Sequence, residues 1–387
     1  MAEIKEIRNA MRKKKRNRTI RRICIVVILL ALVVAIILNR DNLTPEAISQ
    51  WLSNSVSPNS GEEGFPVSLP SGEMVSLLGV GDNVVLTTQT NAYFYSARGK
   101  ELRNIQHSCK GVQSKAAGDN LLIYSVGGNR VLVETKTKTA ATVEPQNKIL
   151  TGAISKNGRF AIATESDVYT SEMTVYDKNG NAVFKWTPSG SVITGLALSE
   201  DGKRVAAATV YTEGGVLMTG VHLFETGKSE ALFSYKLKDE IAVSLVVYKN
   251  SVRVITDSSV TDIDESGELK GTLGFDEKKL ISAVECDGGS ALVFEDVNDP
   301  SKSMLEIVND KTAIKAQAAV GKALKSADSD GKDIYLMADD EVMKYSSTTA
   351  VKIGSSKIEH GGERLAACEA GAFVITSASE LLRPELN

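Results

Sequence analysis

Histidine and cysteine side chains, which could serve as general bases or nucleophiles, are few in this sequence. Its 387 residues include three histidines (His107, His222 and His360) and four cysteines. None of the histidines stands in a recognisable catalytic grouping, and no Gly-x-Ser-x-Gly elbow, phosphate-cradling glycine-rich loop or His-Glu-x-x-His helix occurs. We therefore predict no catalytic residues and no cofactor site, and we expect the protein not to be an enzyme.

One acidic segment has the residue types of a calcium site. Asp328-Ser-Asp330-Gly331-Lys-Asp333 resembles the start of a calcium-binding loop, in which carboxylates alternate along the chain. In that register Met337 replaces the acid that should close the loop. Because Asp-Gly is also favoured in hairpin turns, we interpret the segment as a turn and predict no metal site.

The cysteine spacing does not indicate a disulfide framework. Cys24 lies in an apolar run, whereas Cys286 and Cys368 are 82 residues apart and occupy the same position of a repeat described below. Equivalent positions in non-adjacent repeats lie too far apart for a disulfide. We interpret Cys286 and Cys368 as small buried residues, which leaves Cys109 without a partner.

The elements that position these side chains repeat along the chain. From Phe65 onward, short runs rich in Val, Ile, Thr and Tyr alternate with Gly, Asn and Asp, which is typical of strands and hairpins. The segments 153–164 and 197–208 both read as strand, Asn-Gly or Asp-Gly turn, strand, and they are 44 residues apart. Third strands with an aromatic residue and fourth strands follow, so each unit has the four strands of a propeller blade.

Eight copies of this unit cover residues 65–387. Their equivalent positions, close to the turn glycine, are Leu78, Lys115, Ser155, Ser199, Val247, Cys286, Ala327 and Cys368. The fold class is therefore all-β, an eight-bladed β-propeller of four-stranded antiparallel blades, with seven blades as the alternative. The last copy lacks an outermost strand, which Phe65–Leu69 could supply to close the ring and protect the sheet edges.

An apolar segment precedes the propeller. Ile23–Leu38 is sixteen residues without a charge, and Arg21, Arg22 and Arg40 can extend to the membrane interfaces. We predict a transmembrane helix over residues 23–38, with a cleaved signal peptide or a buried helix as alternatives. Residues 1–22 carry ten Lys or Arg and two acids, which predicts a cytoplasmic N-terminus, an extracytoplasmic propeller and a location in the plasma membrane.

Residues 39–64 are predicted to contain a juxtamembrane helix and a linker. Thr44 and Pro45 are typical of a helix start, and Trp51 is a residue type that settles at membrane interfaces. The helix could rest on the bilayer or pack on the propeller. Residues 53–64 have the composition of a flexible spacer. Beyond residue 22, 35 basic and 46 acidic residues give a net charge of −11, which argues against nucleic acid as a partner.

The Ser-x-Asn/Asp-Gly hairpins at Ser155 and Ser199 resemble those of WD40-like and quinoprotein-like propellers. The whole layout is similar to an uncharacterised family of membrane-anchored propellers from Clostridia-type Gram-positive bacteria. This resemblance implies a cell-envelope location and no particular chemistry. The segment from Tyr176 to Trp186 is similar to a repeat of quinone-cofactor propellers, whose Trp docks between blades, but it occurs once. We interpret Trp186 as ring-closing packing and predict no such cofactor.

The candidate partner-binding residues lie in loops between second and third strands, which emerge on one face of a propeller. The residues we select are Tyr169, Tyr211 and Glu213, on adjacent blades. Loops on a rigid scaffold commonly carry recognition. We predict a scaffold that binds an envelope or membrane protein or a cell-wall polymer. The alternative is a ligand sensor or enzyme with an unmarked site in the central channel.

Overall fold

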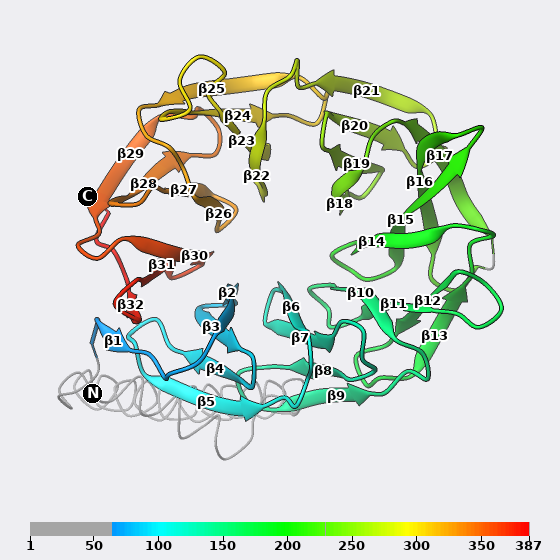
Figure 1. Cartoon of the computed structure of the whole chain (residues 1–387), viewed down its shortest axis with the longest axis horizontal. Coiled ribbons are helices and arrows are strands. Elements are labelled where there is room, and N and C mark those ends of the chain that lie inside the picture. Colours follow the sequence, from blue (N-terminus) through cyan, green and yellow to red (C-terminus); the bar gives the residue numbers. More distant parts are fainter. Residues whose placement is uncertain (1–63, 229, 387) are drawn as a thin grey trace, which may run out of the picture. The chain divides into compact units, whose positions relative to one another are not determined.

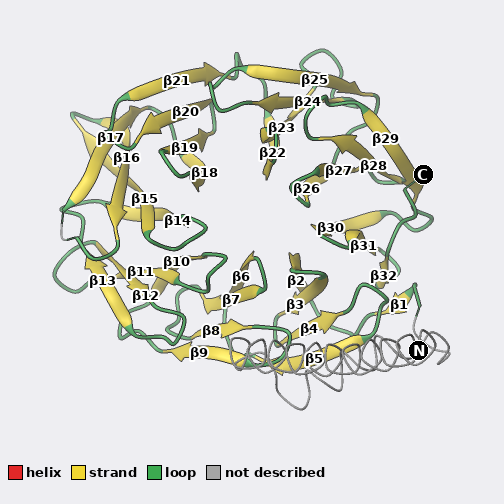
Figure 2. Ribbon diagram, turned by 180° about the vertical axis from the view of Figure 1, so that it is seen from behind, coloured by secondary structure: helices red, strands yellow, loops and turns green. Residues whose placement is uncertain are grey.

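The computed structural model describes residues 64–228 and 230–386, which form strands β1 to β32 and no helix (Figure 2). The predicted transmembrane helix at residues 23–38, the juxtamembrane helix, and the predicted interface residues Arg21, Arg22, Arg40 and Trp51 lie outside the described residues. Within residues 64–228 and 230–386, no helix is long and apolar enough to cross a membrane.

Eight four-stranded antiparallel sheets surround a central opening (Figure 1), which confirms the prediction of eight blades over seven. In chain order, blade 1 consists of β2 (Met74–Val80), β3 (Asn83–Thr88), β4 (Asn91–Tyr95) and β5 (Glu101–Gln106), and blade 2 of β6 (Val112–Ala117), β7 (Asn120–Ser125), β8 (Val131–Glu134) and β9 (Thr139–Val143). Blade 3 consists of β10 (Ile149–Ile154), β11 (Phe160–Glu165), β12 (Ser171–Tyr176) and β13 (Ala182–Trp186), and blade 4 of β14 (Val192–Leu198), β15 (Arg204–Glu213), β16 (Val216–Glu225) and β17 (Ala231–Lys238).

Blades 5 to 8 follow the same order, from the innermost to the outermost strand. Blade 5 consists of β18 (Ala242–Val247), β19 (Ser251–Thr256), β20 (Ser259–Asp264) and β21 (Leu269–Gly274), and blade 6 of β22 (Leu280–Cys286), β23 (Gly289–Glu295), β24 (Ser303–Val308) and β25 (Ile314–Val320). Blade 7 consists of β26 (Ser326–Ser329), β27 (Asp333–Met337), β28 (Glu341–Ser346) and β29 (Lys352–Lys357), and blade 8 of β30 (Gly362–Cys368), β31 (Gly371–Thr376), β32 (Glu380–Leu382) and β1 (Val67–Ser68).

The first and last strands of the chain close the ring. β1 pairs with β32, with Val67 opposite Leu381 and Ser68 opposite Glu380. The predicted closure by the segment 65–69 is therefore confirmed. Both ends of the described chain contribute to blade 8, so its sheet forms only when these two segments meet.

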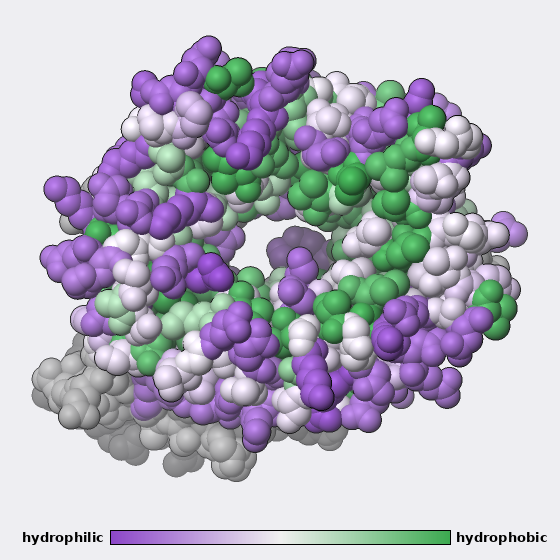
Figure 3. Space-filling view, in the orientation of Figure 1, coloured by the Kyte–Doolittle hydropathy of each residue, from purple (hydrophilic) through white to green (hydrophobic). Residues whose placement is uncertain are grey.

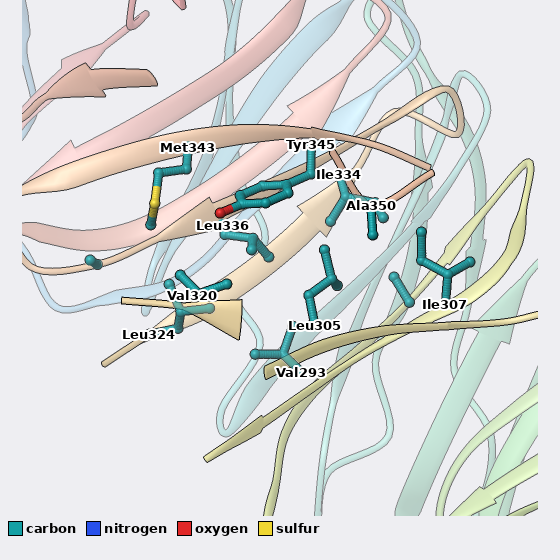
Figure 4. Close-up of a cluster of buried hydrophobic side chains, with 12 residues drawn as sticks. Val293, Leu305, Ile307, Val320, Leu324, Ile334, Leu336, Met343, Tyr345 and Ala350 are labelled. Carbon is teal, nitrogen blue, oxygen red and sulfur yellow. The ribbon is translucent and has the colours of Figure 1, made fainter. Parts of the chain in front are cut away.

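Apolar side chains fill the interfaces between neighbouring blades. In the cluster between blades 6 and 7, Val293 and Leu305 of one blade face Ile334 and Leu336 of the next (Figure 4). Each of the eight blade–blade interfaces in the described chain contains a cluster of this kind. The core is therefore distributed around the ring, and each blade is stabilised by both of its neighbours.

The antiparallel order gives the ring two different faces. Turns from first to second strands and from third to fourth strands lie on one face, which we name the turn face. Loops from second to third strands and the connections to the next blade lie on the other, which we name the loop face. Gly64 lies beside Gly99, and Arg383 donates to the carbonyl of Ala97. Since Gly99 and Ala97 belong to one β4–β5 turn, both ends of the described chain lie at the turn face.

Candidate functional site

The turn face is joined from blade to blade by hydrogen bonds between its turns. Gly81 N–H donates to the carbonyl of Gly118 (2.8 Å), and Asn157 Nδ2 donates to the carbonyl of Asp201. The turn glycines Gly158 and Gly202 have φ of +85° and +64°, a conformation that glycine adopts without the cost of a Cβ. These turns are thus held by their neighbours, and their polar groups are largely used within the ring.

A buried ion pair lies beneath the turn face between blades 5 and 6. Arg253 on β19 donates to Asp262 on β20 (2.6 and 2.9 Å) and also to the carbonyl of Asn309 in the next blade. Thr312 donates to the same carboxylate at 2.7 Å. Both charged side chains are almost inaccessible to water. Asp262 accepts hydrogen bonds from Arg253 in its own blade and from Thr312 in the next blade. Sequence reasoning missed this pair, because nothing in the local pattern shows that the two residues face each other.

The loop face presents apolar side chains to solvent. Twelve large apolar residues are exposed in the described chain, and five of them lie on or beside outermost strands. The other seven lie on the loop face, across blades 2 to 6: Val126, Val168, Tyr169, Val192, Ile241, Val243 and Val297. We name these seven residues the apolar arc. Val168 and Val297 are 83% and 68% exposed, so their side chains are available for contact with a partner.

A hairpin in blade 4 extends further than its counterparts. β15 and β16 each contain ten residues, where the corresponding strands of blade 3 contain six. The two strands remain paired to the tip, with Glu213 opposite Val216, and Gly214 and Gly215 form a two-residue turn with φ of +60° and +83°. The sequence around Tyr211 was expected to be a loop, and the structure instead shows continued strands.

The structure brings together two of the three predicted partner-binding residues. Tyr211 and Glu213 lie on the blade 4 hairpin, where Lys236 contacts both: its Nζ is 2.8 Å from the Glu213 carboxylate and 5.9 Å from the Tyr211 ring centroid. Tyr169 is half-exposed in the β11–β12 loop of blade 3, where its backbone N–H donates to Ser166 Oγ (3.2 Å). All three lie at the loop face.

Sequence reasoning missed Val168 and Val297, the most exposed members of the apolar arc. Both are apolar residues within otherwise polar loops, and that contrast was an available signal. Val243 was missed for a different reason: it reads as an ordinary strand residue. In the structure it is the extra residue of a β-bulge between Ala242 and Ser244, and it is 62% exposed.

Two of the three histidines occupy structural positions. Burial lowers the pKa of His222 to about 4, so its ring is neutral near pH 7. Its Nδ1 lies 2.9 Å from Ser234 Oγ, and the ring packs against Trp186 from blade 3. Trp186 therefore packs between blades 3 and 4, whereas the ring closes at blade 8, so the interpretation of Trp186 as ring-closing packing was wrong. Burial also lowers the pKa of His107, whose Nδ1 accepts the backbone N–H of Cys109.

The acidic segment on blade 7 forms a turn, as predicted. Asp328 accepts the backbone N–H of Ala367 on the inner strand of blade 8 (2.8 Å), and Asp330 accepts that of Asp333 (2.7 Å) and the hydroxyl of Tyr335. Burial raises the pKa of Asp328 to about 6. Within residues 64–228 and 230–386, no group of three or more His, Cys, Asp or Glu could hold a metal ion. Cys109, Cys286 and Cys368 are free thiols.

A recess lies in the wall of the central channel. It has a volume of about 330 Å³ and is formed by β6, β10, β14 and β18, the inner strands of blades 2 to 5. Lys115 is the one charged residue among those that line it. Figure 3 shows the opening through the ring, with hydrophobic residues gathered on the side of these strands and hydrophilic residues on the side of β26 and β30.

The fold and these surfaces define an all-β protein of the eight-bladed β-propeller class. The chain belongs to the family of unknown function DUF5711, which matches residues 68–360. This agrees with the part of the predicted resemblance that concerns an uncharacterised propeller family; membrane anchoring and a Clostridia-type origin stay predictions. No curated protein matches the sequence.

Several solved structures share the fold at low sequence identity. Sqt1 of Saccharomyces cerevisiae has a TM-score of 0.61 and 11% identity, over 83% of this chain and 98% of that chain. The computationally designed Ika8 protein has a TM-score of 0.59 and 14% identity, over 83% and 98%. BamB from Moraxella catarrhalis has a TM-score of 0.53 and 11% identity, over 82% and 98%. These likenesses establish the propeller fold alone.

Proposed function

We propose that this protein is a non-enzymatic binding scaffold of the cell envelope. In this proposal a helix over residues 23–38 anchors it in the plasma membrane as a single-pass protein, with the N-terminus in the cytoplasm and the propeller outside. The loop face binds another envelope or membrane protein, or a cell-wall polymer. The observation that carries the binding role is the apolar arc across blades 2 to 6.

The two faces support this choice of binding surface. Turns on the turn face are engaged in bonds between blades, and both ends of the described chain lie there. The loop face holds the apolar arc and the projecting hairpin of blade 4. Exposed valines favour a protein partner, since burying them against apolar groups stabilises a complex by about 25 cal/mol for each Å² of apolar surface that is removed from water.

In-cell crosslinking, followed by detergent purification and mass spectrometry, tests the proposal. The control carries residues 1–64 fused to an unrelated β-domain, which separates binding by the propeller from binding by the segment before it. We expect a membrane or wall-synthesis protein to be enriched only with the native propeller. Substituting Tyr169→Ser, Tyr211→Ser and Glu213→Gln together should reduce its recovery. Absence of any enrichment under several growth conditions would contradict the scaffold role.

The alternative prediction, a ligand site in the central channel, is supported by one observation, the channel recess. Its lining lacks the groupings of acid, base and nucleophile that enzymes use. The recess is better suited to holding a ligand than to transforming one.

A further inference from the structure

Inner strands of the propeller have one edge without a strand partner. β6, β10, β14 and β18 each stand at the end of their sheet and pair with a second strand on one side only. Apart from Ile149 of β10, whose backbone bonds to Gly127 and Gly128 of blade 2, their other side faces the channel. Backbone N–H and C=O groups at such an edge are a template for an added extended chain. The channel recess lies against these four edges.

Small residues line this wall. Gly152, Ala153, Gly195 and Ala197 are among the residues of the recess, so few side-chain atoms cover the backbone of β10 and β14 there. The volume of about 330 Å³ is at the lower limit of typical ligand sites, which range over about 300–1,000 Å³. A few residues of extended chain fit this space, whereas a folded element does not.

Lys115 supplies the charge that selects the ligand. Its side chain is exposed and makes no ion pair or hydrogen bond with any residue in 64–228 or 230–386. No acid lines the recess. An ammonium group at a recess that no acid lines favours a carboxylate. A chain terminus carries a carboxylate and can enter a channel without having to return.

We propose that the channel recess binds the carboxyl-terminal residues of a partner protein in an extended conformation, with the terminal carboxylate at Lys115. This rests on the proposed scaffold function and adds a second contact to the loop face. The backbone of the tail pairs with an inner-strand edge, and its side chains contact Leu196, Val243 and Leu245. Because pairing uses the backbone, small and β-branched residues in the tail are accommodated without a fixed sequence.

Methyl NMR of the full-length protein in detergent micelles tests this binding. The probe is the pentapeptide Ala-Val-Thr-Val-Ala with a free carboxyl terminus, compared with the same peptide as an amide. Signals of Leu196, Val243 and Leu245 report on the recess, while Leu269 and Val351 near the outer rim serve as internal references. We expect the free acid to shift the recess signals in a saturable way and the amide to bind at least tenfold more weakly.

Charge variants identify the selecting group. Lys115→Ala should remove the preference for the free acid, Lys115→Arg should keep it, and the matched control Lys178→Ala at the turn face should leave it unchanged. Equal shifts with both peptides, or shifts confined to the rim, would overturn the proposal. Saturation of the same signals by acetate at the peptide's concentration would also overturn it, because recognition would then need only a carboxylate and no chain.

The outcome is separable from that of the scaffold proposal. If Lys115→Ala leaves partner recovery intact while Val168→Asp with Val297→Asp abolishes it, the channel inference fails and the scaffold role stands. If no partner is recovered with any form of the protein, the scaffold role fails, and a positive peptide titration would then describe a ligand site of the isolated channel.

Discussion

The turn face and the loop face are built from the same repeats, but they differ in how far their side chains are engaged within the ring. At the turn face, the turn at Asn157 bonds to the turn of the next blade, and Arg253 reaches across an interface to the carbonyl of Asn309. At the loop face, the most exposed apolar residues, Val168 and Val297, contribute little to the core. The turn face therefore contributes mainly to stability, whereas the loop face is the surface that we propose binds a partner.

The largest expected effect is the loss of the buried arginine beneath the turn face. Arg253→Met removes the partner of Asp262 and leaves a buried carboxylate without its charge pair. Breaking such a pair costs about 3–5 kcal/mol in other proteins. We therefore expect the free energy of unfolding to fall by about that amount, measured by urea denaturation followed by circular dichroism.

A double variant separates the charge pair from its packing. Arg253→Met with Asp262→Leu replaces both charges with apolar groups, which is often neutral for stability. We expect the double variant to recover most of the loss. If its loss of stability instead equals the sum of the losses in the two single variants, the hydrogen bonds of each residue to blade 6, and not the charge pair, stabilise the ring. Partner binding at the loop face should be unchanged wherever the ring remains folded.

A smaller and pH-dependent effect is expected at Asp328, which joins blades 7 and 8 near the turn face. Its pKa is raised by burial to about 6, compared with about 3.9 in an unfolded chain. Between these two values the folded protein binds more protons, so the contribution of this residue to stability grows as pH falls from about 7 to about 4. The full change is on the order of 2–3 kcal/mol.

Asp328→Asn isolates this contribution from that of other carboxyl groups. The amide oxygen can still accept the N–H of Ala367 but does not titrate. The variant should be more stable than the native protein at pH 8, and the difference should disappear near pH 4. A difference that stays constant across this range in urea denaturation would show that Asp328 does not titrate with a raised pKa.

The sequence was sufficient to predict the ring because the repeat is local. Turn residues such as Gly158 and Gly202 mark each hairpin, so the blade count and the closure through residues 65–69 followed from spacing. The pairing of Arg253 with Asp262 could not be predicted in the same way. The pairing depends on which side of its strand each residue faces and on the groups that the neighbouring blade supplies. Neither can be deduced from the spacing of residues in the sequence.

The candidate site was less predictable than the fold. The loop with Tyr169 and the hairpin with Glu213 were correctly assigned to one face, since strand order alone determines where such connections emerge. Which residues on that face are exposed depends on the packing of each loop. The recess beside Lys115 depends further on the shape of four inner strands from different blades, and a repeat pattern contains no signal for such a cavity.

Substitutions in the apolar arc test the binding side of the comparison. Val168→Asp with Val297→Asp should reduce partner recovery at least tenfold, about 1.4 kcal/mol in binding free energy, because both apolar surfaces become charged. Stability should change by less than about 0.5 kcal/mol, since both side chains are mostly exposed. The control is Val351→Asp beside the outermost strand of blade 7, where Val351 is 58% exposed. Equal loss in the control would show that hydrophobicity alone, and not the loop face, drives recovery.

The smallest expected effect comes from the ion pairs on the surface of the turn face. Lys156 Nζ lies 2.5 Å from the Glu200 carboxylate, which links blades 3 and 4, but the two side chains are 60% and 75% exposed. Exposed pairs contribute about 0.2–1 kcal/mol and weaken with salt. A double-mutant cycle with Lys156→Ala and Glu200→Ala should give a coupling energy in this range that falls further in 1 M NaCl. A coupling well above 1 kcal/mol that is insensitive to salt would mean that surface charges stabilise the turn face as much as its hydrogen bonds between turns. The stability of that face would then rest on its charges, and the buried pair at Arg253 would no longer be its main polar contribution.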